Sequence, residues 1–107
     1  MLKLWDESLK YLNIALKYNE ANKDIYYYLG IAYNGKTKWD DAIAATQKGL
    51  DLSASEKDDF KAKFYYEMGN AYKGKALNDK ACECFKKATF GSFAEEVKKE
   101  LTLLKCK

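Results

Sequence analysis

Apolar and polar residues alternate with the period of an α-helix through most of this chain. Between residues 3 and 18 the apolar residues recur at three- and four-residue steps: Leu4, Trp5, Leu9, Leu12 and Leu16. This spacing places them on one face of a helix. The same period predicts helices at about 23–34, 39–52, 56–73 and 78–89, and a last one within 92–106. The sequence contains no proline, which favours uninterrupted helices.

One segment of the chain occurs twice, 39 residues apart. Tyr26–Lys36 returns as Tyr65–Lys75, with Tyr, Gly, Ala, Tyr, Gly and Lys in the same order at the same spacing. A second match, 34 residues apart, relates Trp5-Asp6-Glu7 to Trp39-Asp40-Asp41. Repeats of this length indicate one structural unit used more than once. The first helix matches the third, so the chain begins on the second helix of a unit whose first helix is missing.

Several residues predict where the helices begin and end. Asn22 precedes the second helix, where its side chain can accept from free backbone amides. Gly35 and Gly74 are expected to adopt the left-handed conformation that ends many helices. Ser55 and Ser92 each precede an acidic residue by three positions, so both resemble capping boxes.

Two glycines lie inside predicted helices instead of at their ends. Gly30 and Gly69 each cost about 1 kcal/mol relative to alanine at such a position. We expect them where a neighbouring helix packs too closely to admit a Cβ. Ala42 and Ala81 are the matching small residues on the partner helices.

These residues carry a resemblance to a known family. The sequence resembles the tetratricopeptide repeat pattern, W-x2-L-G-x2-Y followed by A-x3-F. Its two copies here are Tyr26-x2-Leu29-Gly30-x2-Tyr33 with Ala42-x3-Thr46, and Tyr65-x2-Met68-Gly69-x2-Tyr72 with Ala81-x3-Phe85. Tyr stands in place of the family's Trp, and Thr46 in place of its aromatic residue.

The resemblance implies a single all-α domain over residues 1–107. Antiparallel helix pairs would stack as a short right-handed α-solenoid. Its parts would be a half repeat at about 3–22, repeats at about 23–54 and 55–90, and a closing helix at about 92–106. Such a closing helix has one apolar stripe and a polar back, because a terminal unit has only one neighbour to bury against.

The resemblance also implies a binding surface. In this family the first helices of successive repeats line a concave groove that holds a peptide or a partner's helix. By spacing, the groove residues here are Asp24, Tyr27, Ile31 and Asn34 from one repeat, and Lys63, Tyr66, Asn70 and Lys73 from the next. The partner is then another protein or peptide. The alternative is that the tyrosines only shield the helix crossings.

A second predicted surface lies on the first helix. One neighbouring helix cannot cover all of its leucines, and the uncovered stripe would be Leu4, Leu9, Leu12 and Leu16. Either the chain self-associates there as a homo-oligomer, or it is a fragment whose other repeats cover the stripe. The alternative function is therefore a structural element that assembles through this helix.

Composition narrows the classes of partner. The 19 basic residues are interleaved with 16 acidic ones, so no basic stripe for nucleic acid is predicted. No apolar run approaches the ~20 residues that span a bilayer, so no membrane insertion is predicted. The segment Met1–Glu7 reaches acidic residues too soon for a secretory signal. Three cysteines without framework spacing favour a reducing compartment such as the cytoplasm.

No catalytic, metal or cofactor site is predicted. Histidine is absent, and the pairs Asp40-Asp41 and Asp58-Asp59 stand at helix starts, where they complement the helix dipole. Cys82-x-Cys84 lacks further ligands for a metal. Comparison of the repeats predicts that Cys82 is buried and that Cys84 faces outward. We therefore expect an interaction module and not an enzyme.

Overall fold

A computed structural model describes residues 2–106, apart from the side chains of residues 2–4 and 92. Within this range the chain is all-helical and has no strand, which confirms the all-α part of the predicted fold class. The elements are α1 (Leu2–Tyr18), α2 (Lys23–Gly35), α3 (Trp39–Leu52), α4 (Asp58–Gly74), α5 (Asn78–Lys87), the 3₁₀ turn η1 (Gly91–Phe93) and α6 (Ala94–Leu103).

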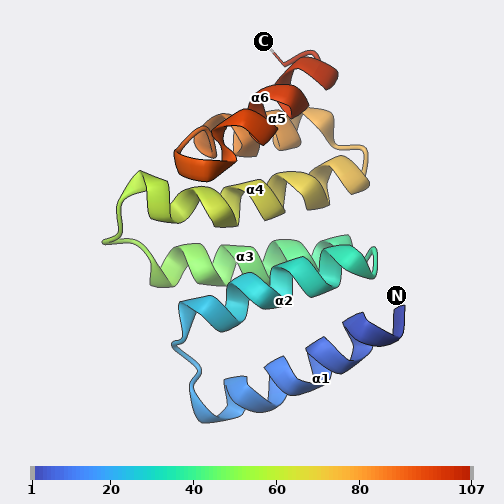
Figure 1. Cartoon of the computed structure of the whole chain (residues 1–107), viewed down its shortest axis with the longest axis vertical. Helices are drawn as coiled ribbons and strands as arrows, with labels where there is room; N and C mark the ends of the chain where they lie inside the picture. Colours follow the sequence, from blue (N-terminus) through green and yellow to red (C-terminus); the bar gives the residue numbers. More distant parts are fainter. Residues whose placement is uncertain (1, 107) are drawn as a thin grey trace.

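The helices lie side by side in the order of the sequence (Figure 1). Each helix packs on the next one along the chain, and α2 also contacts α4. Helix α1 lies at one end of this row and α6 at the other (Figure 1). The two ends therefore each have a side that no further helix of the described chain covers.

The core forms three clusters of buried residues that follow the row. At the α1 end, Ile25, Leu29 and Ala45 pack together. Phe64 and Met68 of α4 centre the middle cluster, and Phe85, Val97 and their neighbours fill the α6 end. Phe64, Phe85 and Val97 are each fully enclosed. Because every cluster joins consecutive helices, each helix is held mainly by its nearest neighbours.

The same turn ends α2, α4 and α6. In each case a backbone N–H donates to the carbonyl five residues earlier at 2.9 Å: Lys38 to Tyr33, Leu77 to Tyr72, and Cys106 to Leu101. The residue just before each donor is left-handed, with φ of 60°, 61° and 55° at Thr37, Ala76 and Lys105. Helix α6 therefore ends as the first helices of the two repeats do.

The prediction that Gly35 and Gly74 are left-handed is wrong. Both are the last residues of their helices, and the positive φ belongs to the residue two places further on. Glycine is needed because an indole ring lies over the backbone: Trp5 covers Gly35, and Trp39 covers Gly74. A Cβ at either position would overlap that ring.

An ion pair accompanies each of these tryptophan–glycine contacts. Lys36, next to Gly35, pairs with Asp6, next to Trp5. One repeat later, Lys75 pairs with Asp40 in the same way. Two short motifs, Trp-Asp at a helix start and Gly-Lys at a helix end, thus join α1 to α2 and α3 to α4.

The glycines inside the helices mark close helix crossings, as predicted. A Cβ built on Gly30 would lie 2.7 Å from Thr46 Cγ2, and one on Gly69 would lie 2.7 Å from Phe85 Cε1. Ala42 and Ala81, which were expected to be the matching residues, are fully buried nearby. The closest approach is instead made by the residue one turn further along α3 and α5.

The helix starts agree with the sequence in part. Asn22 caps α2, and its Oδ1 accepts from the N–H of Asp24 at 2.9 Å. Helix α4 begins at Asp58 with no side-chain cap, so the capping box predicted at Ser55 does not form. The start predicted at Ser92 is a 3₁₀ turn, after which α6 begins at Ala94 without a side-chain cap. The side chain of Ser92 lies outside the described part.

Candidate functional site

The eight residues predicted to line a groove lie on α2 and α4, which contact each other directly. At one end of this α2–α4 face, Lys63 is enclosed by other side chains. Its Nζ lies 3.5 Å from Asp24 Oδ1, 4.3 Å from the Phe60 ring centroid and 5.1 Å from the Tyr27 ring centroid. Lys63 therefore has its charge satisfied within the chain.

The rings of Tyr27 and Tyr66 contact phenylalanine rings in and beside the core. The Tyr27 ring meets Phe64 edge-on, with centroids 5.9 Å apart. The Tyr66 ring lies 5.1 Å from Phe93 and 6.2 Å from Phe85. Burial raises the pKa of both tyrosines. Both remain half-buried, so they shield the helix crossings and also keep surface available to a partner.

A polar cluster lies on this face beside the tyrosines, and sequence reasoning missed its central residue. Asn34 Nδ2 donates to the backbone oxygen of Glu67 at 2.9 Å and to Glu67 Oε1 at 3.2 Å. Asn70 Nδ2 lies 3.5 Å from the same Oε1. Asn34 Oδ1 is buried and has no hydrogen-bond partner among the described residues. The cluster therefore bridges α2 and α4 and leaves some polar capacity unused.

Glu67 is the unusual group in this cluster because it is a carboxyl that is only 9% exposed. Burial raises its pKa, and the hydrogen bonds from Asn34 and Asn70 oppose that rise. Glu67 replaces Tyr28 of the first repeat. A carboxylate in place of an aromatic residue, within a segment that keeps its Tyr, Gly, Ala and Lys positions, is the signal that could have found it.

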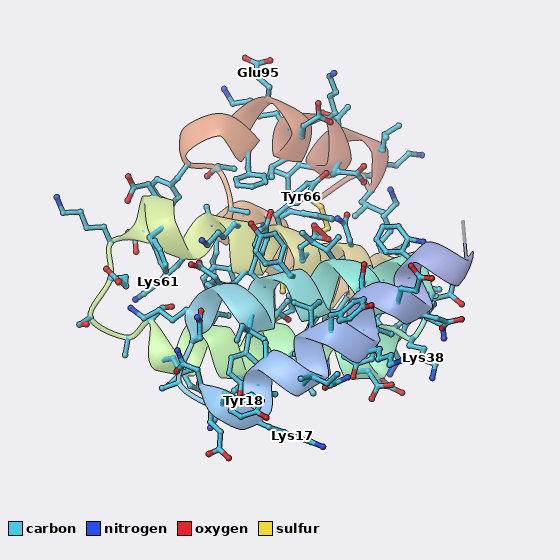
Figure 2. The ribbon with its side chains drawn as sticks, turned by 60° about the horizontal axis from the view of Figure 1, so that its bottom comes forward. Lys17, Tyr18, Lys38, Lys61, Tyr66 and Glu95 are labelled. Carbon is cyan, nitrogen blue, oxygen red and sulfur yellow. A yellow bond between two sulfur atoms is a disulfide. The ribbon has the colours of Figure 1, made fainter. Side chains whose placement is uncertain are left out.

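The remaining predicted residues lie towards the two ends of the face. Lys73 Nζ lies 2.6 Å from Glu100 Oε2, so α6 continues the face beyond α4. Figure 2 shows Tyr66 on the side of α4 that the viewer sees, and Glu95 on the outer side of α6. Ile31 lines a pocket between α1 and α2.

The leucines predicted as a self-association stripe are largely packed. Leu9, Leu12 and Leu16 are half-buried against the cluster that Ile25 and Leu29 form. The side chain of Leu4 lies outside the described residues. Among the described side chains of α1, the large apolar residues that are exposed are different ones: Tyr11, Ile14 and Tyr18.

The cysteines differ from the sequence prediction. Cys82 of α5 is joined to Cys106, after α6, by a disulfide with 5.6 Å between the Cα atoms. Cys84 is the buried one and is free, so the predicted positions of Cys82 and Cys84 are reversed. Burial raises the pKa of the Cys84 thiol to about 11, which leaves little reactive thiolate. The disulfide also removes the argument for a reducing compartment.

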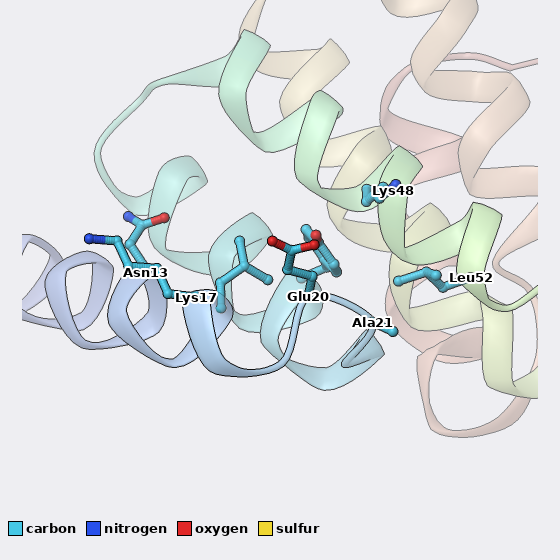
Figure 3. A pocket seen from close by; sticks show the side chains of 8 residues that line it. Asn13, Lys17, Glu20, Ala21, Lys48 and Leu52 are labelled. Carbon is cyan, nitrogen blue, oxygen red and sulfur yellow. The ribbon is translucent and has the colours of Figure 1, made fainter.

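A pocket of about 640 Å³ opens between α1 and α3 (Figure 3). It has an equivalent of about 410 Å³ between α3 and α5, one repeat further along. Tyr26 and Lys48 line the first, and Tyr65 and Lys87 hold the matching places in the second. Because both pockets recur at the same place in the repeat, they follow from helix spacing and do not by themselves indicate a ligand.

Neither a metal site nor a membrane-spanning helix is present in the part of the chain that the structure describes. There, no group of three or more Cys, Asp or Glu side chains is arranged to hold a metal ion. None of the described helices is both long and apolar enough to cross a membrane.

Comparison with known proteins does not assign the chain to a family. No protein-family model matches the sequence, and no curated protein matches it significantly.

Proposed function

We propose that this chain is a tetratricopeptide-like interaction module that binds a segment of another protein along the α2–α4 face. Three features support the repeat architecture: the doubled tryptophan–glycine contact, the threefold turn after α2, α4 and α6, and the contact of α2 with α4. The first two features recur from one unit to the next, and the third joins equivalent helices of successive units. A family of this kind works by binding, and its first helices carry the binding face.

The observation that carries the proposal is the polar cluster that lies beside Tyr27 and Tyr66. Asn70 is half-buried; its Nδ2 lies 3.5 Å from Glu67 Oε1, and its side chain also hydrogen-bonds with the Tyr66 side chain. Because the contact with Glu67 is long, the Asn70 amide can turn to the backbone of an extended peptide that lies over Tyr66. Tyrosines on either side add contact area at a small cost in conformational entropy.

A peptide-display selection against the immobilised chain tests this proposal. Random peptides selected by the natural chain should bind at least about tenfold more weakly to an Asn70→Arg variant. The matched control is Ala44→Arg on the exposed side of α3, which adds the same side chain away from the α2–α4 face. The proposal fails if no peptide is enriched, or if both variants lose binding equally.

The variants are chosen so that folding does not decide the result. Alanine in place of Tyr27 or Tyr66 would remove contacts to Phe64, Phe85 and Phe93, so lost binding would have two explanations. Asn70→Arg leaves these aromatic contacts in place. Thermal unfolding followed by circular dichroism checks that both variants keep the helical fold.

A further inference from the structure

A second surface lies at the α1 end, in the pocket between α1 and α2. The pocket has a volume of about 350 Å³, and its lining is mainly apolar: Trp5, Ser8, Tyr11, Leu12, Tyr28, Ile31 and Ala32. Two of its tyrosines face solvent, with Tyr11 67% and Tyr28 54% exposed. Exposed aromatic residues around an apolar pocket indicate a binding surface.

The internal repeat identifies what fits such a pocket. Leu12 of α1 corresponds to Thr46 of α3, 34 residues later, and Tyr28 corresponds to Glu67, 39 residues later. Between Thr46 and Glu67 lies Gly30 of α2: a Cβ there would be 2.7 Å from Thr46 and 4.0 Å from Glu67 Cβ. The equivalent place one unit further on is thus filled by a helix.

We propose that the pocket between α1 and α2 binds an amphipathic helix of another protein. That helix presents a glycine or alanine between Leu12 and Tyr28, as α2 presents Gly30 between Thr46 and Glu67. Leu12 is larger than Thr46, so a bulky side chain at this point of the bound helix would overlap it. The tyrosines then cover the flanks of the bound helix.

Charge adds a second requirement for the bound helix. Asp24 of α2 pairs with Lys63 at 3.5 Å across the filled site. The residue that corresponds to Lys63 at the α1 end is Asp24 itself, whose side chain is 68% exposed. The bound helix therefore carries Lys or Arg six residues before its small residue, where α2 carries Asp24.

The other end of the same chain does not provide this helix. By the shared turn, α6 places Lys98 where α2 has Gly30 and α4 has Gly69. Lys98 is exposed and too large for the closest approach to Leu12. Helix α6 of a second copy therefore does not fit the pocket, and a head-to-tail array of copies through α6 is not expected.

The experiment uses a synthetic helix made from the chain's own α2. Its sequence is that of residues 22–36 with Lys in place of Asp24, and a lactam bridge on its outer face keeps it helical. Fluorescence anisotropy measures its binding to the full chain. We expect Tyr11→Arg to weaken binding at least about tenfold and Tyr18→Arg, an equally exposed site outside the pocket, to leave it unchanged.

Two comparisons make the result specific. The same peptide with its original Asp24 should bind more weakly, because it meets Asp24 of the chain. Asn70→Arg should not alter binding of the lysine peptide, which separates this pocket from the α2–α4 face. If Tyr11→Arg perturbs the fold by circular dichroism, Tyr28→Arg replaces it.

Three outcomes would overturn the proposal. One is the absence of saturable binding, and another is an equal loss of binding in Tyr11→Arg and Tyr18→Arg. The third is a dimer of the chain alone, seen by light scattering, that Tyr11→Arg dissociates. That last result would make a second copy the occupant of the pocket.

Discussion

The two ends of the row are built from different kinds of helix and present different surfaces: α1 matches α3 in sequence, whereas α6 ends with the same turn as α2 and α4. At the α1 end, Tyr11, Ile14 and Tyr18 are exposed and an apolar pocket opens beside them. At the α6 end, Val97 is fully buried and Glu95 lies on the outer side of α6 (Figure 2), while Lys98 is also exposed. The exposed large apolar residue of α6 among the described residues is Leu103, whereas α1 exposes three such residues around and beside a pocket.

The ends also differ in what fastens them. Helix α1 is held to α2 by the Trp5–Gly35 contact and the Asp6–Lys36 ion pair. At the α6 end, Asn78 replaces the tryptophan and Leu103 replaces the glycine, and the disulfide follows within one turn. At the α6 end a disulfide thus replaces the aromatic contact and the ion pair that join the other helices. Helix α6 is attached covalently, whereas α1 is held by noncovalent contacts.

Removing the disulfide should have the largest effect on this contrast. Replacing Cys82 and Cys106 by Ser opens a loop with a sequence separation of 24 residues, and the chain-entropy model gives a loss of about 3 kcal/mol in the free energy of unfolding. Urea unfolding measures the loss, and hydrogen exchange locates it. We expect the amides of α6 to lose protection before those of α2.

Cys84→Ala is introduced into both the natural chain and the double Ser variant, so that the free thiol cannot exchange with the disulfide. The chain that carries Cys84→Ala alone is the reference. Reduction of that reference protein by a dithiol should reproduce the effect of the double Ser variant. Equal loss of protection along the whole row would contradict a local fastening of α6.

The two tryptophan–glycine contacts should contribute differently to the free energy of unfolding, because one lies in the middle of the row and the other at its α1 end. Trp39→Ala removes a contact in the middle of the row and should cost about 3 kcal/mol, whereas Trp5→Ala should cost less. An end unit can detach without unfolding its neighbours, and Trp5 also lines the open pocket. Thermal unfolding compares the two, with exposed Tyr18→Ala as the control. A larger loss for Trp5→Ala would show that the α1 end is the better fastened one.

The repeated pattern was enough to predict the helices and much of their packing. Gly30 and Gly69 are conspicuous in the sequence because glycine inside a helix is costly, and the structure places both at close crossings. Asn22 was identifiable because a helix cap depends on neighbouring residues only. Local chemistry and spacing carry this kind of information.

What the sequence did not predict depends on distance in space. Helix α6 ends in a third copy of the turn, in which the Cys106 N–H donates to the Leu101 carbonyl. This turn brings Cys106 to Cys82, with which it forms the disulfide. Gly35 was assigned to a turn because its conflict with Trp5 is visible only in three dimensions. Glu67 matched the repeat poorly, but its burial follows from the approach of α2.

The smallest expected effect concerns Glu67, which is buried in the middle of the row. The residues at the same place in the repeat are Tyr28 at the α1 end and the exposed Glu96 on α6. Burial raises the pKa of Glu67 in the folded chain. Between the ordinary glutamate pKa and this raised one, the folded chain therefore keeps a proton that the unfolded chain has released. Stability therefore falls as the pH rises from the ordinary glutamate pKa through the raised one.

Glu67→Gln should remove this fall while it keeps an acceptor for Asn34 and Asn70. At neutral pH the variant should then be as stable as the natural chain or more stable, by up to about 1 kcal/mol. Urea unfolding at a series of pH values measures the change, and Glu96→Gln at the exposed equivalent should leave the pH dependence as it is. If Glu67→Gln instead destabilises the chain increasingly as the pH rises, the ionised carboxylate is the form that α2 and α4 require, and the interior of the row tolerates a charge that burial alone argues against.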